Sequence, residues 1–176
     1  MAPILTEHSF DVISHSPKQT WRIGEKLSSY LRPGDVVCLQ GDLGSGKTCL
    51  TQGIGAGLEI TGVISSPTFV FINEHAPASP ARPYLYHTDL YRITSYMEAL
   101  TIGLEEYMYG DGITVIEWAE HALEILPEDR LWITLTFLAY TKRRLFFEAA
   151  GERYIEILIA LRQSLYGPKR TVSAPL

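Results

Sequence analysis

The sequence contains little of several features that mark other classes of protein. Its 176 residues include only two cysteines, Cys38 and Cys49, which excludes a disulfide framework and a cysteine-based metal site. It has no apolar run long enough to span a membrane. Residues 1–10 contain no basic segment followed by an apolar block, so we expect no signal peptide. These absences favour a cytoplasmic protein with two buried free thiols.

Positive charge is also scarce. The chain has 15 lysines and arginines against 20 acidic residues, which gives a formal net charge of −5. Proteins that hold nucleic acid by themselves usually carry a basic face, because contacts with phosphates supply much of their affinity. We therefore expect any contact with nucleic acid to be made through a partner protein.

The most informative stretch runs from Gly41 to Thr48 and has the form G-x-x-x-x-G-K-T, which is typical of a phosphate-binding loop. Its glycines let backbone N–H groups surround an anion, and the following helix adds its positive end. We expect Lys47 to reach the β- and γ-phosphates and the Thr48 hydroxyl to bind Mg²⁺. The predicted nucleotide-binding residues here are Asp42, Leu43, Gly44, Ser45, Gly46, Lys47, Thr48 and Cys49.

The flanking sequence supports this interpretation over a glycine-rich turn with a surface lysine. Residues 36–40 are apolar and predict a buried parallel strand. The residues after Cys49 predict a helix that Gly55 and Gly57 would fray or end. Strand, glycine loop and helix follow one another in the order that a nucleotide-binding loop requires.

The segment before the loop predicts a strand over 9–13 and then a helix. Ser16 and Pro17 are typical of a helix start, and Pro33 marks its end. This helix is mainly structural. The alternative function of Gln19 and Thr20 is to lie at the edge of a nucleotide base, which makes Thr20 a further candidate for nucleotide binding.

Two later strands end in acids. Asp89 follows the strand that begins near residue 84, and Glu117 ends the apolar strand 113–117. Open α/β sheets place ligand chemistry at such strand ends. With Lys47 these acids form the predicted catalytic set, and with Thr48 the predicted metal ligands. One acid would organise Mg²⁺ and the other would position the attacking water. The sequence leaves open which acid has which role, and also the alternative that one of the two is a solvated surface charge.

Two further features have both a structural and a functional interpretation. The segment Ser65–Phe69 is either a turn or a switch loop in which Ser66 and Thr68 sense the γ-phosphate or Mg²⁺. Trp118 either packs in the core or lies at a nucleotide or partner surface.

The remaining patterns complete the expected architecture. They predict a strand over 70–72, an exposed loop over 74–83, a short helix after Ser95, a hairpin from two strands at 131–137 and 144–148, and a helix over 152–165. We expect an α/β fold with a largely parallel sheet, antiparallel strands at its margins and helices on both faces. Residues 1–166 would form one P-loop domain, and 167–176 a mobile tail.

Four blocks in this order resemble the TsaE (YjeE) family, small bacterial ATPases of tRNA threonylcarbamoyladenosine (t6A) biosynthesis. They are Gly41–Thr48, Ser66–Phe69, His87–Arg92 and Glu117–Glu120, and residues 103–107 also fit. The resemblance implies that Lys47 and Thr48 bind phosphate and Mg²⁺, with Asp89 in the Mg²⁺ shell. It also implies that Thr68 lies in a nucleotide-responsive loop and that Glu117 and Trp118 are important for ATP turnover.

The resemblance further implies that the chain acts with TsaD and TsaB, with tRNA held mainly by those partners, and that its ATPase activity is weak without them. The alternative is a small-molecule kinase that uses Asp89 or Glu117 as base. A GTPase-type switch is disfavoured, because the only asparagine, Asn73, is followed by Glu74 and no Asn-Lys-x-Asp motif exists.

Overall fold

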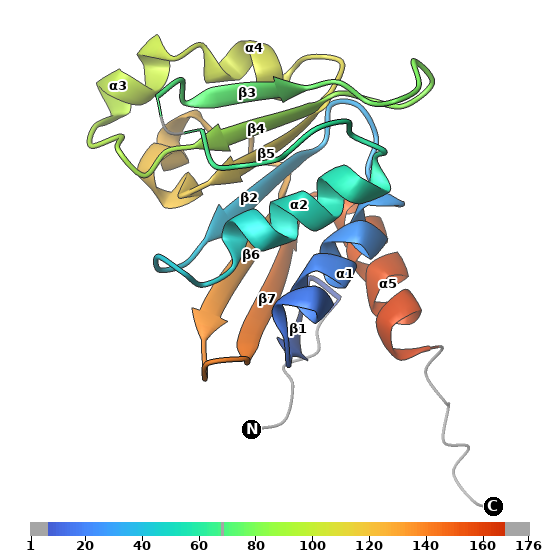
Figure 1. The fold of residues 1–176 in the computed structure, drawn as a ribbon. Helices are drawn as coiled ribbons and strands as arrows, with labels where there is room; N and C mark the ends of the chain where they lie inside the picture. Colours follow the sequence, from blue (N-terminus) through green and yellow to red (C-terminus); the bar gives the residue numbers. More distant parts are fainter. Residues whose placement is uncertain (1–6, 68, 168–176) are drawn as a thin grey trace, which may run out of the picture.

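The computed structural model describes residues 7–67 and 69–167. In this part of the chain, seven strands form one sheet with the order β1-β7-β6-β2-β5-β4-β3 (Figure 1). The strands are β1 (Ser9–Ser14), β2 (Val36–Gln40), β3 (Ile72–His75), β4 (Leu85–Asp89), β5 (Ile113–Glu117), β6 (Arg130–Phe137) and β7 (Arg143–Ala150).

The centre of the sheet is parallel and its margins are antiparallel. Strands β6, β2, β5 and β4 run in one direction. Strands β7 and β1 are added antiparallel at one side, and β3 at the other. The predicted sheet is confirmed, including the hairpin that joins β6 to β7, and the first strand lies at one edge.

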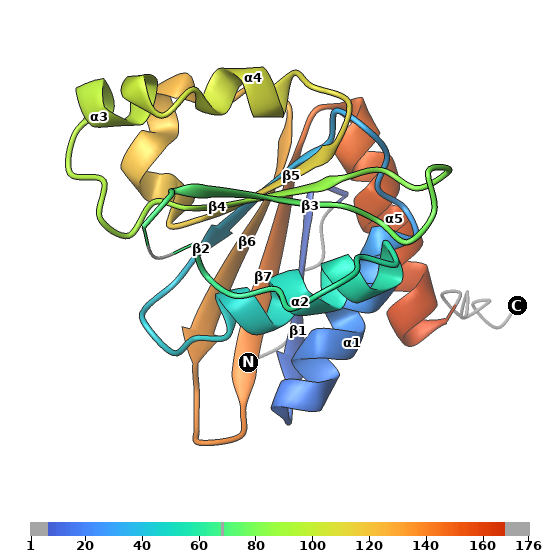
Figure 2. The ribbon, with the colours of Figure 1, turned by 45° about the horizontal axis from the view of Figure 1, so that its top comes forward.

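Helices cover both faces of the sheet, as predicted (Figure 2). Helices α1 (Pro17–Ser28), α2 (Lys47–Gly57) and α5 (Glu152–Tyr166) pack on one face, and α3 (Tyr96–Thr101), α4 (Leu104–Met108) and the 3₁₀ segment η1 (Ala119–Ile125) on the other. Strand β2 serves both layers: Val37 and Leu39 belong to the first apolar cluster, and Val36 and Cys38 to the second. Alternate side chains of a strand point to opposite faces of the sheet, so this apolar strand is buried under helices on both faces.

Helix α2 passes through Gly55, one of the two glycines expected to fray or end it, and ends at Gly57, the other. Gly53 also lies within the helix. A methyl group on Gly53 would collide with the backbone carbonyl of Trp21 in α1, and one on Gly55 would collide with Ile64. These glycines therefore permit close packing rather than ending the helix, and the sequence pattern alone does not distinguish the two roles.

We expect Gly53→Ala to lower the free energy of unfolding by about 2 kcal/mol, because overpacking against a backbone costs more than the ~1 kcal/mol that alanine adds to a helix. Chemical denaturation of the two proteins measures the difference. Gly24→Ala is the matched variant on α1, where the new methyl group would meet the Leu50 carbonyl. If both variants were more stable than the wild type, the two helices would be able to move apart at no cost in free energy, and the prediction would be wrong.

Two local predictions differ from the structure. The strand expected at 70–72 is β3, which begins at Ile72 and extends into the residues expected to start a loop, because Asn73 and His75 pair with β4. Helix α1 ends at Ser28, five residues before Pro33.

The predicted mobile tail lies outside the described residues beyond Gly167, so the domain limits stay predictions. Between residues 7 and 167, no helix combines the length and apolar character needed to cross a bilayer.

Candidate functional site

The loop between β2 and α2 has the backbone conformation of an anion cradle. Gly41, Gly44 and Gly46 have φ values of 147°, 78° and 105°, in the region that favours glycine. A methyl group on Gly41 would also collide with the Leu135 carbonyl oxygen. The sequence therefore places glycine where the backbone requires it, and the loop leads directly into the N-terminus of α2, an arrangement that binds phosphate.

Lys47 extends over this loop and is only 5% exposed. Its Nζ donates to the carbonyl oxygens of Gly41 at 2.5 Å and Asp42 at 3.0 Å. It also lies 3.9 Å from the centre of the Trp118 ring. Burial lowers the pKa of Lys47, while nearby acids, Glu117 first, oppose this shift. The ammonium group is thus held beside the cradle by contacts that a phosphate group can replace.

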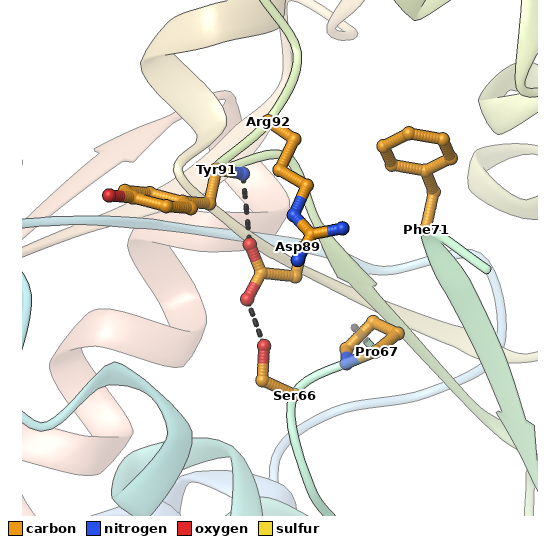
Figure 3. A pocket seen from close by; sticks show the side chains of 6 residues that line it. All are labelled: Ser66, Pro67, Phe71, Asp89, Tyr91 and Arg92. Atoms are coloured by element: carbon orange, nitrogen blue, oxygen red, sulfur yellow. Dashed lines mark hydrogen bonds between the residues drawn. The ribbon is translucent and has the colours of Figure 1, made fainter. Parts of the chain in front are cut away.

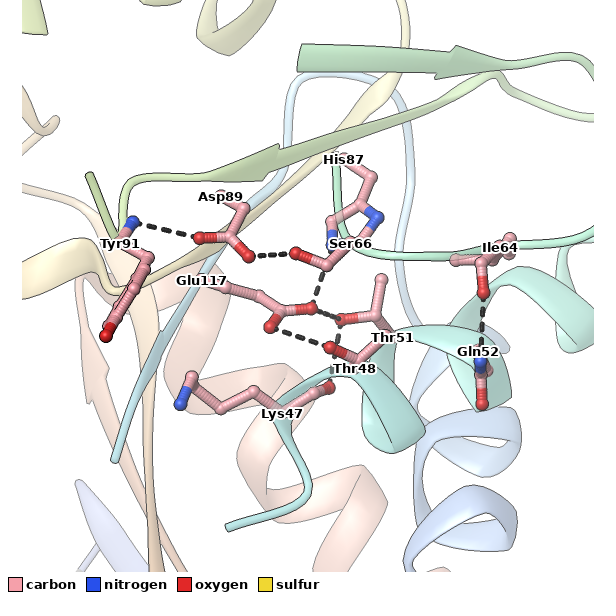
Figure 4. Close-up of polar contacts among 10 residues, drawn as sticks. All are labelled: Lys47, Thr48, Thr51, Gln52, Ile64, Ser66, His87, Asp89, Tyr91 and Glu117. Atoms are coloured by element: carbon pink, nitrogen blue, oxygen red, sulfur yellow. Dashed lines mark hydrogen bonds and ion pairs between the residues drawn. The ribbon is translucent and has the colours of Figure 1, made fainter. Parts of the chain in front are cut away.

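Glu117 ends β5 beside the start of α2 and is 2% exposed (Figure 4). Thr48 Oγ1 donates to its Oε2 at 3.0 Å. Its Oε1 lies 2.8 Å from Nε2 of His87 and 3.2 Å from Oγ1 of Thr51. The predicted acid and the predicted Thr48 are therefore in direct contact. Thr51 and His87 were not predicted as site residues, and their only signals in the sequence are their spacing from Lys47 and Asp89.

Asp89 is the residue that pairs with Glu117 across β4 and β5, but its surroundings differ. One carboxylate oxygen accepts from the Ser66 hydroxyl and the other from the backbone N–H of Tyr91 at 2.9 Å. These residues line an open pocket of about 100 Å³ together with Pro67, Phe71 and Arg92 (Figure 3). Asp89 thus connects the segment predicted to act as a switch to the sheet. Thr68, the other predicted switch residue, lies outside the described residues.

Trp118 packs in part against the core and also lies beside the phosphate loop, and its role toward nucleotide or partner stays a prediction. It is partly buried against the second apolar cluster, and it contacts Lys47. Its φ of 58° is unusual for a residue other than glycine. The rings of Trp118 and Tyr91 have centroids 5.0 Å apart. The indole therefore links the phosphate loop to the segment that follows Asp89.

Two other predicted nucleotide-binding residues are less accessible. Thr20 is 1% exposed, and its hydroxyl shares a 2.7 Å hydrogen bond with Ser14. Contact between Thr20 and a base would require this bond to be exchanged, so its assignment stays a prediction. Ser45 is also buried, and among the described residues its hydroxyl has no hydrogen-bond partner. A buried hydroxyl with no partner is consistent with a loop that takes a polar ligand.

The oxygen donors of the site suit magnesium. Mg²⁺ is held in such sites by one or two protein oxygens together with phosphate oxygens and water. Thr48 and Glu117 supply adjacent hard oxygen donors, and Asp89 lies on the neighbouring strand. Within residues 7–67 and 69–167 there is no group of three or more His, Cys, Asp or Glu side chains that forms a metal cluster on its own. The donor set therefore fits a nucleotide-dependent Mg²⁺ site.

The two cysteines should differ in reactivity. Cys38 is fully buried, and burial raises its pKa to about 12. Cys49, expected to be buried, is only partly so, and its thiol donates to the Pro17 carbonyl. We expect a thiol reagent at pH 8 to modify Cys49 alone in the native protein and both residues after denaturation. ATP should slow the native reaction. Cys49→Ala is the control, and rapid labelling of Cys38 in it would contradict the prediction.

The structure has a P-loop fold of the mixed α/β class: a parallel sheet core, a glycine loop that leads into a helix, and acids on adjacent strand ends. The family model for threonylcarbamoyl adenosine biosynthesis protein TsaE matches residues 14–145. The chain therefore belongs to the TsaE family of t6A biosynthesis proteins, and the resemblance inferred from the sequence motifs is confirmed.

Individual relatives agree with the family model. The tRNA threonylcarbamoyladenosine biosynthesis protein TsaE of Bacillus subtilis is 41% identical over 139 residues, which cover 79% of this chain and 85% of that protein. Its namesake from Treponema pallidum is 40% identical over 133 residues, covering 76% and 96%. The crystal structure of Bacillus subtilis YdiB has a TM-score of 0.76 and 32% identity, and the match covers 93% of this chain and 98% of that one.

Proposed function

We propose that the chain is a Mg²⁺-dependent ATPase that acts in the cytoplasm with TsaD and TsaB to support repeated t6A modification of tRNA. The observation that carries this proposal is the contact between Glu117 and Thr48 beside a lysine-bearing phosphate loop. It places an acid beside the phosphate-binding residues, where the acid can hold Mg²⁺ and position water for hydrolysis.

In this proposal, the loop amides and the first turn of α2 bind the phosphates, and Lys47 exchanges the Gly41 and Asp42 carbonyls for phosphate oxygens. Thr48, Asp89 and Glu117 hold Mg²⁺, which neutralises charge on the phosphates when bound. Glu117 orients the attacking water, and Asp89 couples the Ser66 segment to the site. The products are ADP and phosphate.

The surroundings of the site support dependence on a partner. Tyr91, which lines the Asp89 pocket, is 53% exposed, and Phe69, whose ring centre lies 5.7 Å from the guanidinium carbon of Arg92 in that pocket, is 85% exposed. An open site allows water to screen the charges that stabilise the transition state. TsaD and TsaB would cover this side and carry the tRNA, which fits the net charge of −5.

The test is to measure ATP binding by calorimetry in magnesium buffer and phosphate release with and without purified TsaB and TsaD. We expect binding by the chain alone, slow hydrolysis, and an increase of at least about tenfold with both partners, as excluding water and ordering a loop can supply. The absence of ATP binding in all mixtures would refute the proposal.

A small-molecule kinase remains the second candidate, because one arginine lies beside the loop. Arg143 Nη2 donates to the Gly44 carbonyl at 3.3 Å. Its Nη1, however, donates to the carbonyls of Ala139, Tyr140 and Lys142 within its own hairpin. A kinase would transfer phosphate to an added acceptor and would not respond to TsaB and TsaD, so the same assay separates the two functions.

A further inference from the structure

His87 is a buried polar residue for which the proposed hydrolysis has no assigned role. It lies on β4, two residues before Asp89, and is 0% exposed. Its Nε2 lies 2.8 Å from Oε1 of Glu117 (Figure 4). A fully buried imidazole that contacts a buried carboxylate costs solvation free energy. Such an arrangement needs an explanation beyond packing.

The hydrogen bonds of the two Glu117 oxygens show what His87 contributes. Oε2 accepts from Thr48, and Oε1 is shared by Thr51 and His87. The Thr51 hydroxyl has one proton and lies closer to the Lys47 carbonyl oxygen, at 3.0 Å, than to Oε1, at 3.2 Å. Among the described residues, His87 is therefore the donor to Oε1 that has no competing acceptor.

The other side of the imidazole has no hydrogen bond in the described part of the chain. Nδ1 of His87 is buried and has no partner there. Because an ionised carboxylate only accepts hydrogen bonds, the proton of a neutral His87 ring must be on Nε2. The position of the ring is set by β4, which lies between β3 and β5. A rigid strand thus aims a single donor at Glu117.

This donor fixes the orientation of the carboxylate. Thr48 holds one oxygen from the phosphate side, and a carboxylate held at one oxygen can still rotate about its side-chain bonds. His87, which projects from β4, holds the other oxygen. Two donors on two oxygens fix the plane of the carboxylate, which sets where a water molecule can be bound and polarised.

We propose that His87 is the positioning residue of ATP hydrolysis, which holds Glu117 in the orientation that directs the attacking water. This inference rests on the proposed ATPase function. It concerns the chemical step and not nucleotide binding, because His87 contacts Glu117 and not the phosphate loop.

The variants His87→Leu and His87→Gln test it. Leucine removes the donor, while the glutamine amide can place a donor near the position of Nε2. We expect His87→Leu to lower kcat about 10- to 100-fold, the range seen when a residue that orients an active-site group is lost. KM and the dissociation constant of a fluorescent ATP analogue should change less than about twofold, because His87 does not contact the loop that binds the nucleotide. His87→Gln should recover most of the rate.

His75→Leu is the matched control. His75 is a second histidine, on the adjacent strand β3, with its ring centroid 6.2 Å from that of His87. Its Nε2 is also buried without a partner, and no contact with Glu117 exists among the described residues. We expect its kcat to stay within about twofold of wild type, because it holds no group of the site. If His75→Leu and His87→Leu lose equal activity, the effect is a general one on the sheet and the proposal is wrong.

A double variant separates positioning from structural support. If His87 acts through Glu117, adding His87→Leu to Glu117→Ala should lower the residual rate no further. Independent losses that multiply would overturn the proposal, as would a normal kcat in folded His87→Leu. If His87→Leu does not fold, a His87→Gln protein as inactive as Glu117→Ala would equally overturn it. A wild-type protein without turnover would instead refute the ATPase function itself.

Discussion

Replacement of Lys47 by alanine should abolish ATP hydrolysis, lowering the rate by about 10³-fold, the loss expected when a charged donor to the developing phosphate charge is removed. Lys47 is the cation held beside the loop carbonyls. Without it, the loop amides remain but the charge on the phosphates is not balanced. Phosphate release in the presence of TsaB and TsaD is the measurement.

The Lys47→Ala protein should remain folded. Because burial lowers the pKa of Lys47, folding disfavours its charged form, and the lysine contributes more stability as pH rises through its folded pKa. Removal of the ammonium group therefore removes an unfavourable contribution to the free energy of folding, the desolvation of a buried charge. We expect an unchanged or higher melting temperature near neutral pH. Lys47→Met, which keeps most of the side-chain volume, is the control. Hydrolysis by either variant at the wild-type rate would show that the site has been wrongly assigned.

Replacement of Glu117 should separate hydrolysis from binding. We expect Glu117→Ala to lower kcat by about 10²- to 10³-fold, the range for loss of a group that positions and activates water. ATP binding should weaken far less, because the loop amides, Lys47 and the other two proposed Mg²⁺ donors, Thr48 and Asp89, are unchanged. Single-turnover phosphate release and calorimetry on the same protein give the two quantities.

Loss of a buried carboxylate has a second effect that must be controlled. In Glu117→Ala, the donors of Thr48 and His87 lose their acceptor, which costs about 1–3 kcal/mol for a buried group. Glu117→Gln keeps the shape and one acceptor, so its melting temperature should lie closer to wild type while its kcat stays low. If Glu117→Gln in the assembled complex hydrolysed ATP normally, the assignment of Glu117 would have to be abandoned.

Local chemistry made the phosphate loop and the strand ends predictable. The spacing of glycine and lysine from Gly41 to Thr48 indicates the backbone conformation of the phosphate loop. The apolar strands that end in Asp89 and Glu117 identify the edge of the sheet at which the site lies. Composition does not predict which residues surround each acid, since this depends on register. The pairing of β4 with β5 places Asp89 opposite Glu117, and His87 opposite Val115.

Residues with two common roles were the ones that sequence reasoning could not resolve. A buried histidine usually packs in a core, so nothing in the pattern selects His87 as a partner of Glu117. Gly53 resembles a helix-ending glycine until the position of α1 is known, because its role depends on a helix more than twenty residues away. In both cases the deciding contact is distant in sequence.

The edge strand β1 has a consequence for how a newly made chain folds. Its six residues, 9–14, pair with 143–148 of β7, and no other strand of the described residues lies beside it. During synthesis the first strand therefore has no partner until residues 143–148 have left the ribosome. Phe10, which stacks on Phe147 with ring centroids 4.8 Å apart, stays without that neighbour for the same time. Closure of the sheet at this edge must wait for β7, and contacts of such long range slow folding.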